Sequence, residues 1–166
     1  MKHIKGNLLD FPAGINVLVH QANIEGNMGA GIAAQIARRF PVAADVDRAA
    51  FKSGTAKLGE FSVAYLKGNN SMIVNLYGQS IRRKSRAGIP TDYNAVWRAL
   101  EGLNDFLLEQ PKHIIKDSFS GKFVIGVPKF MGCALGGGNW NVYSTIIEET
   151  VGHNFPVVCV EFDMKG

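Results

Sequence analysis

The feature that most constrains the fold is a valine-rich run that passes through a glycine-rich segment directly into a helical pattern. The run is NVLVHQA (16–22), a short apolar stretch that predicts a buried strand. The segment AGIAAQIARRF (30–40) has its large apolar residues at helical spacing, and GNMGAG (26–31) joins the two. A strand followed closely by a helix is the unit of layered α/β folds. The pattern therefore predicts a sheet covered by helices.

The remainder of the chain repeats this alternation. Further strands are predicted at 60–66, 71–78, 122–128 and 156–162, and further helices at 42–53, 93–110 and 141–151. Thr91 or Asp92 is expected to cap the helix at 93–110, and 111–122 is compatible with a strand or a loop. Alternation of this kind favours an α/β fold with a largely parallel sheet, in which ligands bind beyond the carboxyl ends of the strands. Both glycine-rich segments of the chain are then expected on one rim.

Composition narrows the class of protein. The 166 residues suit one domain with one core, and 46% apolar and 19% charged residues are typical of a globular chain. No apolar stretch approaches the roughly 20 residues that a membrane helix needs, and the start MKHIKGNLLD lacks the apolar block of a signal peptide. Cys133 and Cys159 form neither a zinc pattern nor a disulfide framework. We therefore expect a cytoplasmic protein with no membrane partner.

The net charge of +4 has a local origin. The run IRRKSR contains Arg82, Arg83, Lys84 and Arg86; without these four, 14 basic residues balance 14 acidic ones. A neutral protein with one basic loop does not coat nucleic acid uniformly. The segment 82–86 is either a solvated loop or a rim that attracts an anionic substrate or the macromolecule that carries it.

The first glycine-rich segment has the chemistry of an anion site. Gly29, Ala30 and Gly31 open a helix directly after a strand and a turn. Small residues let the backbone approach a ligand, and the free N–H groups and dipole of the helix favour negative charge. The segment is neither a dinucleotide-binding GxGxxG motif nor a nucleotide-triphosphate loop. It is either a pyrophosphate cradle or only a tight turn.

The second glycine-rich segment, GCALGGG (132–138), again follows a predicted strand and precedes a helix. Two such loops on one rim are able to hold a diphosphate from opposite sides. Phe130 and Trp140 flank the segment, and core or lid packing explains them better than a stacking role with a ligand.

Three polar residues lie at and just past the end of the strand 16–22. His20 has an unperturbed pKa of about 6.5, which would let it act as acid or base near neutrality, although a structural histidine is the alternative. Asn23 both donates and accepts hydrogen bonds, which suits the hydroxyl groups of a sugar, and Asn27 follows it. The chain has no Ser-His-Asp arrangement, no HExxH motif and no Cys/His metal set. We therefore expect no metal and no cofactor.

Three separated motifs together resemble the macro domain family, which binds ADP-ribose. They are IKGNLLD, VLVHQANIEGNMGAGIAAQIARRFP and VPKFMGCALGGGNW...IIEET, and they occur in the family's order from about residue 4 to the end of the chain. The resemblance is closest to the branch that contains ADP-ribose-1″-phosphate phosphatase and terminal ADP-ribose glycohydrolases. It implies a single macro domain over 1–166, with a three-layer α/β/α fold and a central mixed, largely parallel sheet.

The resemblance also implies a set of binding residues. The segment at 6–8 would meet the adenine edge, where members often have an aspartate and this chain has Asn7, a weaker acceptor. Asn23 would face the distal ribose, and the two glycine-rich loops would hold the diphosphate. The ligand-binding residues predicted on this basis are Gly6, Asn7, Leu8, Asn23, Asn27, Met28, Gly29, Ala30, Gly31, Ile32, Gly132, Cys133, Ala134, Leu135, Gly136, Gly137 and Trp140.

Departures from that branch distinguish between activities. Its glycohydrolases use a lysine after the strand that here ends in NLYGQS, and an aspartate in the second loop. The matching positions hold Gln79 or Ser80, and Gly136, none of which forms a Schiff base or transfers a proton. Lys84 lies several residues downstream. The phosphatase-like members instead carry a histidine that matches His20.

The sequence thus predicts an enzyme that hydrolyses ADP-ribose 1″-phosphate to ADP-ribose and phosphate. His20 would act as the base for water or as the nucleophile, Asn23 would orient the distal ribose, and N–H groups of the loops would stabilise charge on the phosphoryl oxygens. Three alternatives stay open. One is a hydrolase that removes ADP-ribose from protein or nucleic acid, which the basic segment 82–86 favours. The others are a non-catalytic ADP-ribose reader and an α/β domain with another ligand.

Overall fold

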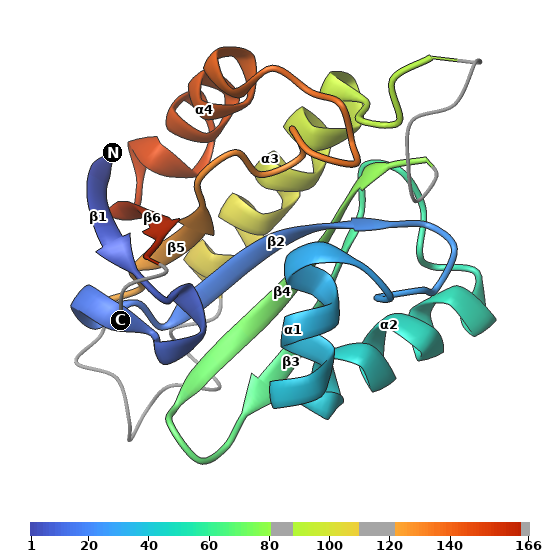
Figure 1. Ribbon diagram of the computed structural model, residues 1–166, viewed down its shortest axis with the longest axis horizontal. Helices are drawn as coiled ribbons and strands as arrows, with labels where there is room; N and C mark the ends of the chain where they lie inside the picture. Colours follow the sequence, from blue (N-terminus) through green and yellow to red (C-terminus); the bar gives the residue numbers. More distant parts are fainter. Residues whose placement is uncertain (81–87, 110–121, 164–166) are drawn as a thin grey trace.

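The computed structural model describes residues 1–80, 88–109 and 122–163 (Figure 1). Its strands are β1 (Lys2–Gly6), β2 (Val17–Asn23), β3 (Phe61–Leu66), β4 (Ser71–Gln79), β5 (Ile125–Pro128) and β6 (Val157–Phe162). Its α-helices are α1 (Gly31–Arg39), α2 (Pro41–Ser53), α3 (Tyr93–Glu109) and α4 (Trp140–Glu149). Short 3-10 turns lie at η1 (Leu8–Asp10), η2 (Pro12–Gly14) and η4 (Val151–His153).

The strands form one sheet in the order β1-β6-β5-β2-β4-β3. All neighbouring pairs are parallel except β3 and β4, which run antiparallel at one edge. The prediction of a mixed, largely parallel sheet is therefore confirmed. Because the parallel strands end at the same edge, the segments that follow them meet there.

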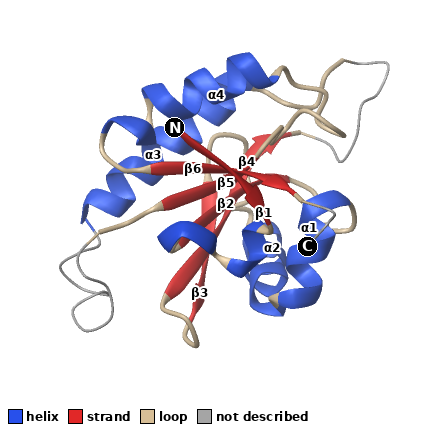
Figure 2. Cartoon of the chain, turned by 60° about the vertical axis from the view of Figure 1, so that its left-hand side comes forward, coloured by secondary structure: helices blue, strands red, loops and turns tan. Residues whose placement is uncertain are grey.

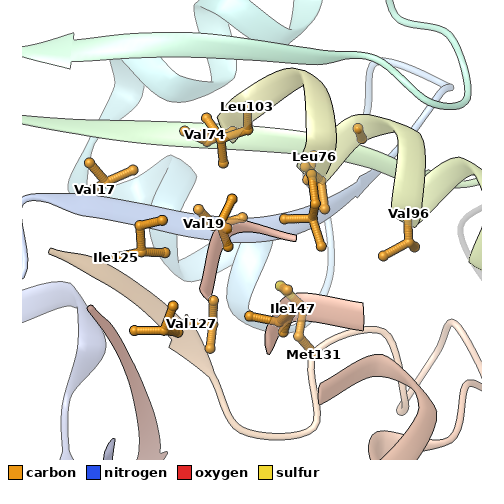
Figure 3. Packing of buried hydrophobic residues seen from close by; sticks show 14 of the residues in the cluster. Val17, Val19, Val74, Leu76, Val96, Leu103, Ile125, Val127, Met131 and Ile147 are labelled. Carbon is orange, nitrogen blue, oxygen red and sulfur yellow. The ribbon is translucent and has the colours of Figure 1, made fainter. Parts of the chain in front are cut away.

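Helices cover both faces of this sheet and make three layers (Figure 2). Alternate residues of each strand point to opposite faces, so Val17 and Val19 of β2 pack toward α3 and α4, as the close view of that core shows (Figure 3). Leu18, between them, packs with residues of α1 and α2, including Ile36 and Ala43. The predicted α/β/α layering is confirmed, with a separate apolar cluster on each side of the sheet.

Two strands differ from what the sequence predicts. β1 was not expected, because KHIKG contains one large apolar residue, Ile4; the strand exists by pairing at the sheet edge, where Ile4 lies opposite Val160. β5 begins three residues later than the predicted start at 122. Ahead of β5, the side chain of Asn16 donates to the Lys122 carbonyl and accepts from the Val124 N–H, at 2.9 and 2.8 Å, so the Val124 N–H bonds to a side chain and not to a neighbouring strand.

Two other expectations depend partly on residues outside the described ranges. All but one residue of the segment 111–122 lies there, so its assignment as strand or loop stays open, and the basic segment 82–86 lies there entirely. Among the described residues, no helix combines the length and apolar character that crossing a bilayer requires.

Candidate ligand-binding site

A cavity of about 360 Å³ opens at the carboxyl edge of the sheet. Residues at the ends of β2, β4, β5 and β6 line it, together with η1 and the first turn of α1. Both glycine-rich segments reach it: Asn27, Ala30 and Gly31 of the first and Gly132 and Gly136 of the second are among its lining residues. The topology explains this meeting, because each segment follows a parallel strand that ends on this rim.

The first loop is folded by the side chain of Asn23. Its Nδ2 donates to the Asn27 carbonyl at 3.0 Å, and its Oδ1 accepts from the Glu25 N–H at 3.0 Å. Such an Asx turn lets the chain reverse without pairing in the sheet. Asn23 therefore shapes the loop and also lines the cavity.

The amino end of α1 has backbone donors but no side-chain cap. Its N-cap residue is Ala30, which has no side chain able to accept a hydrogen bond. Gly31 has φ +57°, a left-handed conformation that glycine adopts without strain, and this turns the chain into the helix. Gly31, Ile32 and Ala33 all line the cavity. The first N–H groups of a helix lack intrahelical acceptors, so this end favours an anion.

The second loop is held by Thr91. The Thr91 hydroxyl donates to the Gly132 carbonyl at 2.9 Å, and the Thr91 N–H donates to the Gly136 carbonyl at 3.1 Å. The helix cap that the sequence assigned to Thr91 or Asp92 belongs to Asp92, whose Oδ1 accepts from the Ala95 N–H at 3.0 Å. Thr91 is thus available to the loop because its neighbour caps α3.

Gln21 connects the loops to the sheet. Its Nε2 donates to Thr91 Oγ1 at 2.9 Å and to Gln79 Oε1 at 3.1 Å, while its Oε1 accepts from the Tyr143 hydroxyl at 2.8 Å. Four segments distant in sequence therefore meet at one carboxamide. The pKa of the Tyr143 hydroxyl is raised by burial, so the hydroxyl keeps its proton and stays a donor.

His20 does not lie where the sequence interpretation placed it. It is fully buried, does not line the cavity, and its Nε2 lies 2.7 Å from Oδ1 of Asn75. Asn75 in turn donates to the Ala43 carbonyl of α2, at 3.2 Å. His20 thus faces the α2 side of the sheet, while its neighbour Gln21 faces the cavity, as strand alternation requires. This position does not agree with the predicted role of His20 in attack on a substrate.

The predicted binding residues divide between those that line the cavity and those that support it. Lining the cavity are Asn7, Leu8, Asn23, Asn27, Ala30, Gly31, Ile32, Gly132, Ala134, Leu135 and Gly136. Outside the lining set are Gly6, Met28, Gly29, Cys133, Gly137 and Trp140. Met28 is buried against the α1–α2 core, and Trp140 stacks on Tyr143. These two side chains serve packing.

The sequence interpretation missed several lining residues, listed here: Leu9, Gln21, Ala33, Gln35, Gln79, Pro128, Lys129, Phe130, Met131, Val160 and Phe162. Phe130, which core or lid packing was expected to explain, is 52% exposed and lines the cavity, with its ring edge against Trp140. Gln21 had a signal in the sequence, since it follows His20 in the same strand. Phe162 also had a signal, because it ends the strand predicted at 156–162, and β6 ends there.

The lining is rich in carboxamides and poor in charge. Asn7, Gln21, Asn23, Asn27, Gln35 and Gln79 contribute amide side chains. Lys129 is the one ionisable side chain among the described lining residues, and its Nζ lies 3.1 Å from Glu161 and 5.0 Å from the Phe130 ring centroid. The described residues also contain no group of three or more His, Cys, Asp or Glu side chains able to hold a metal. The described lining therefore offers hydrogen-bond donors and acceptors, without a carboxylate or imidazole.

Comparison with known proteins identifies the fold. No family model matches the chain. It is 27% identical over 98% of its length to an uncharacterised 17.5 kDa protein in the tk–vs intergenic region of Enterobacteria phage T4, of which 97% is covered. A protein of unknown function from Bacteroides thetaiotaomicron superposes with a TM-score of 0.81 at 24% identity, covering 96% of both chains.

One further solved structure carries the name of the fold, and another contains a ligand. The macrodomain of Mycobacterium tuberculosis DarG superposes with a TM-score of 0.75 at 23% identity, covering 97% of this chain and 95% of that one. Thermosipho africanus DarTG, solved in complex with ADP-ribose, superposes with a TM-score of 0.67 at 17% identity, covering 93% of this chain and 39% of that one. The chain described here has the macrodomain fold.

Proposed function

We propose that this chain belongs to the macro domain family and binds ADP-ribose in the cavity at the carboxyl edge of the sheet. The observation that carries the proposal is the meeting of the uncapped amino end of α1 with the second glycine loop across one cavity. Backbone donors from two loops suit a diphosphate, which has acceptor oxygens on both phosphorus atoms. The ADP-ribose complex of the similarly folded DarTG supports the choice of ligand.

The chemistry of the lining suggests an orientation for the ligand. Leu8, Leu9, Val160 and Phe162 make one end of the lining apolar, which suits a flat base, and Asn7 is the amide beside it. The Oδ1 atom of Asn7 already accepts from the Leu9 N–H at 3.0 Å. Asn23 and Asn27 lie in the first loop, where their amides suit the hydroxyl groups of the distal ribose.

Hydrolysis of ADP-ribose 1″-phosphate is a second proposed activity, in which His20 has no catalytic role. Phosphoryl transfer depends mainly on positioning and on neutralising charge, which Asn23 and the loop N–H groups would supply. In this step a water oxygen bonds to the terminal phosphorus, the bond from phosphorus to O1″ breaks, and the proton of the water ends on O1″. The described lining has no carboxylate or imidazole that could act as a general base. We therefore expect the protein to bind this compound but to hydrolyse it slowly.

Removal of ADP-ribose from protein or nucleic acid is the remaining alternative. Gln79 and Gly136 both line the cavity, and neither replaces the lysine and aspartate that this chemistry uses in similar glycohydrolases. The basic segment 82–86 stays the one feature in its favour, as a contact for a polyanionic carrier. Mono-ADP-ribosylated DNA and protein, offered side by side, test this alternative by release of free ADP-ribose.

Calorimetric titration with ADP-ribose tests the main proposal. We expect saturable binding, and amide chemical-shift changes in both glycine loops when the titration is followed by NMR. ADP and ribose 5-phosphate serve as partial ligands, each lacking part of the molecule, and are expected to bind more weakly. Unmoved amide signals in both loops at millimolar ADP-ribose would overturn the proposal. Phosphate release from ADP-ribose 1″-phosphate, measured in parallel, decides whether the bound compound turns over.

A further inference from the structure

We propose that Gln21 is a positioning residue for ligand binding: its neutral carboxamide holds the second glycine loop in its ligand-binding shape through Thr91. The role as a determinant of ADP-ribose affinity rests on the proposed function. The role as a support for the loop rests on the structure alone. Each of these two roles has its own measurement.

The donor and the acceptor of each hydrogen bond around Gln21 can be assigned. Both N–H bonds of its Nε2 are used, toward Thr91 Oγ1 and Gln79 Oε1, and its Oε1 accepts from Tyr143. Thr91 gives its own proton to the Gly132 carbonyl, so its oxygen is the acceptor for Gln21. Thr91 requires a donor and Tyr143 requires an acceptor, and a carboxamide supplies both.

Thr91 transmits this support to the loop. It bonds to the Gly132 carbonyl by its hydroxyl and to the Gly136 carbonyl by its N–H. The Gly138 N–H also donates to the Gly132 carbonyl, at 2.8 Å, which closes the loop on itself. Gly132 and Gly136 both line the cavity. The shape of this cavity wall thus depends on where the Thr91 hydroxyl points.

The loop lies directly on Gln21, with no space between them. A Cβ atom added at Gly132 would lie 3.0 Å from Gln21 Oε1 and 2.5 Å from the Tyr143 ring. A Cβ atom added at Gly136 would lie 3.0 Å from Gln21 Nε2, and one at Gly78 would lie 2.8 Å from Gln21 Oε1. Three glycines from two segments therefore pack against one side chain. This contact explains why glycine is needed at these positions.

A carboxylate at position 21 removes both hydrogen bonds that Nε2 donates, to Thr91 Oγ1 and to Gln79 Oε1. An ionised Gln21→Glu side chain accepts from Tyr143 but has no proton for Thr91. The Thr91 hydroxyl then turns toward the carboxylate, and the Gly132 carbonyl loses one of its two donors, keeping only the Gly138 N–H. When the new carboxyl is protonated, its single proton donates to Thr91 and restores the original direction of that hydrogen bond, while the donation to Gln79 is lost in both protonation states. The variant therefore has a pH-dependent loop, while the wild-type amide does not titrate.

The experiment compares ADP-ribose affinity across pH in the wild type, Gln21→Glu and Gln35→Glu. Gln35 lines the same cavity from α1 and is exposed, so its variant adds the same charge outside the Gln21 hydrogen bonds. From about pH 5 to about pH 9, we expect affinity of Gln21→Glu to fall about tenfold further than that of Gln35→Glu. Equal pH profiles for the two variants would overturn the role of Gln21 in affinity.

Hydrogen exchange at the Gly138 N–H tests the same role without a ligand. We expect its protection to be lost in Gln21→Glu as the carboxyl ionises, and to be unchanged in Gln35→Glu. Unchanged protection in both overturns the support of the loop by Gln21, whether or not ADP-ribose binds. Failure of the wild type to bind ADP-ribose, with protection lost as expected, overturns the proposed function and leaves the support of the loop established.

Two substitutions at Thr91 separate its hydroxyl from its packing. Thr91→Ser keeps the hydroxyl and is expected to bind ADP-ribose within about twofold of the wild type. Thr91→Val keeps the shape, removes both hydrogen bonds of the hydroxyl, and is expected to bind about tenfold more weakly. Equal affinity of the serine and valine variants would contradict transmission through the hydroxyl.

Discussion

His20 and Asn75 form a buried hydrogen bond of 2.7 Å between two strands, beneath α2. Because Asn75 Nδ2 donates to the Ala43 carbonyl and to Ser62 Oγ, its Oδ1 is the acceptor, and His20 Nε2 carries the proton. Within the described part of the chain, His20 Nδ1 has no hydrogen-bond partner. The ring is thus held neutral in the interior, on the side of the sheet opposite Gln21.

The His20 imidazole makes stability depend on pH. Burial lowers the pKa of the imidazole in the folded state, against smaller opposing effects of the hydrogen bond that the ring donates to Asn75 and of the Gln21 backbone. The unfolded chain takes up a proton near pH 6.5 while the folded chain resists it, so stability falls as pH drops below that value, by up to about 1.4 kcal/mol per pH unit. Denaturant unfolding of the wild type and His20→Gln between about pH 8 and pH 5 measures this. An equal slope in both proteins would exclude His20 as the cause.

The same variant separates structure from catalysis. Since His20 lies outside the cavity, folded His20→Gln is expected to bind ADP-ribose within about threefold of the wild type. Calorimetry at about pH 8, where the wild-type ring is neutral in both states, gives the comparison. Loss of binding in a fully folded variant would mean that His20 acts on the ligand site.

Ala30→Asp is expected to stabilise the protein and weaken its ligand binding. A carboxylate at the N-cap accepts from the free N–H groups of α1 and is worth about 0.5–2 kcal/mol relative to alanine. The same carboxylate occupies the donors proposed for the diphosphate and repels it, so affinity should fall at least about tenfold. Thermal unfolding and calorimetry measure the two effects. Ala30→Ser, a neutral cap, is the control: it should stabilise the helix with a smaller loss of affinity.

Gly136→Ala is expected to damage both the second loop and binding. The new methyl group would clash with Thr91 Oγ1 and lie 2.6 Å from the Gly132 carbonyl oxygen, so the loop has to move, at a cost of about 1–3 kcal/mol. Affinity for ADP-ribose should fall with it. Gly68→Ala is the matched control, because a methyl group there meets nothing within 4 Å. Unfolding midpoints and affinity that are the same in both variants would contradict the packing described for this loop.

Asp47 is a buried acid with the opposite pH dependence to His20. Burial raises its pKa, while hydrogen bonding from the Tyr77 hydroxyl at 2.9 Å and the charge of Arg48 lower it by less. A raised pKa in the folded state means that this group contributes stability at low pH, which is lost as pH rises through the folded value. Asp47→Asn keeps an acceptor for Tyr77 and should remove that loss. Unfolding free energies at about pH 4 and pH 7 test this, and an unchanged difference between them would contradict it.

Local patterns predicted most of the elements. The valine-rich run of β2 and the apolar spacing of α1 and α3 are set by neighbouring residues, so strand and helix follow from the sequence there. β1 was missed because KHIKG has little apolar character, and its pairing with β6 joins the two ends of the chain. The start of β5 was placed too early; ahead of it the Val124 N–H bonds to the side chain of Asn16, more than 100 residues away, a contact that no local pattern shows.

By itself, the sequence determined the order of the α-helices and of every strand after β1, and it placed two glycine-rich loops after strands that end on the same rim. Those features depend on composition and on short-range spacing. Only the tertiary structure decided that Gln21 rather than His20 faces the cavity, and that Thr91 holds the second loop while Asp92 caps α3. The physical reason is that adjacent strand residues face opposite sides, and the helices packed on each side determine which of them meets a ligand.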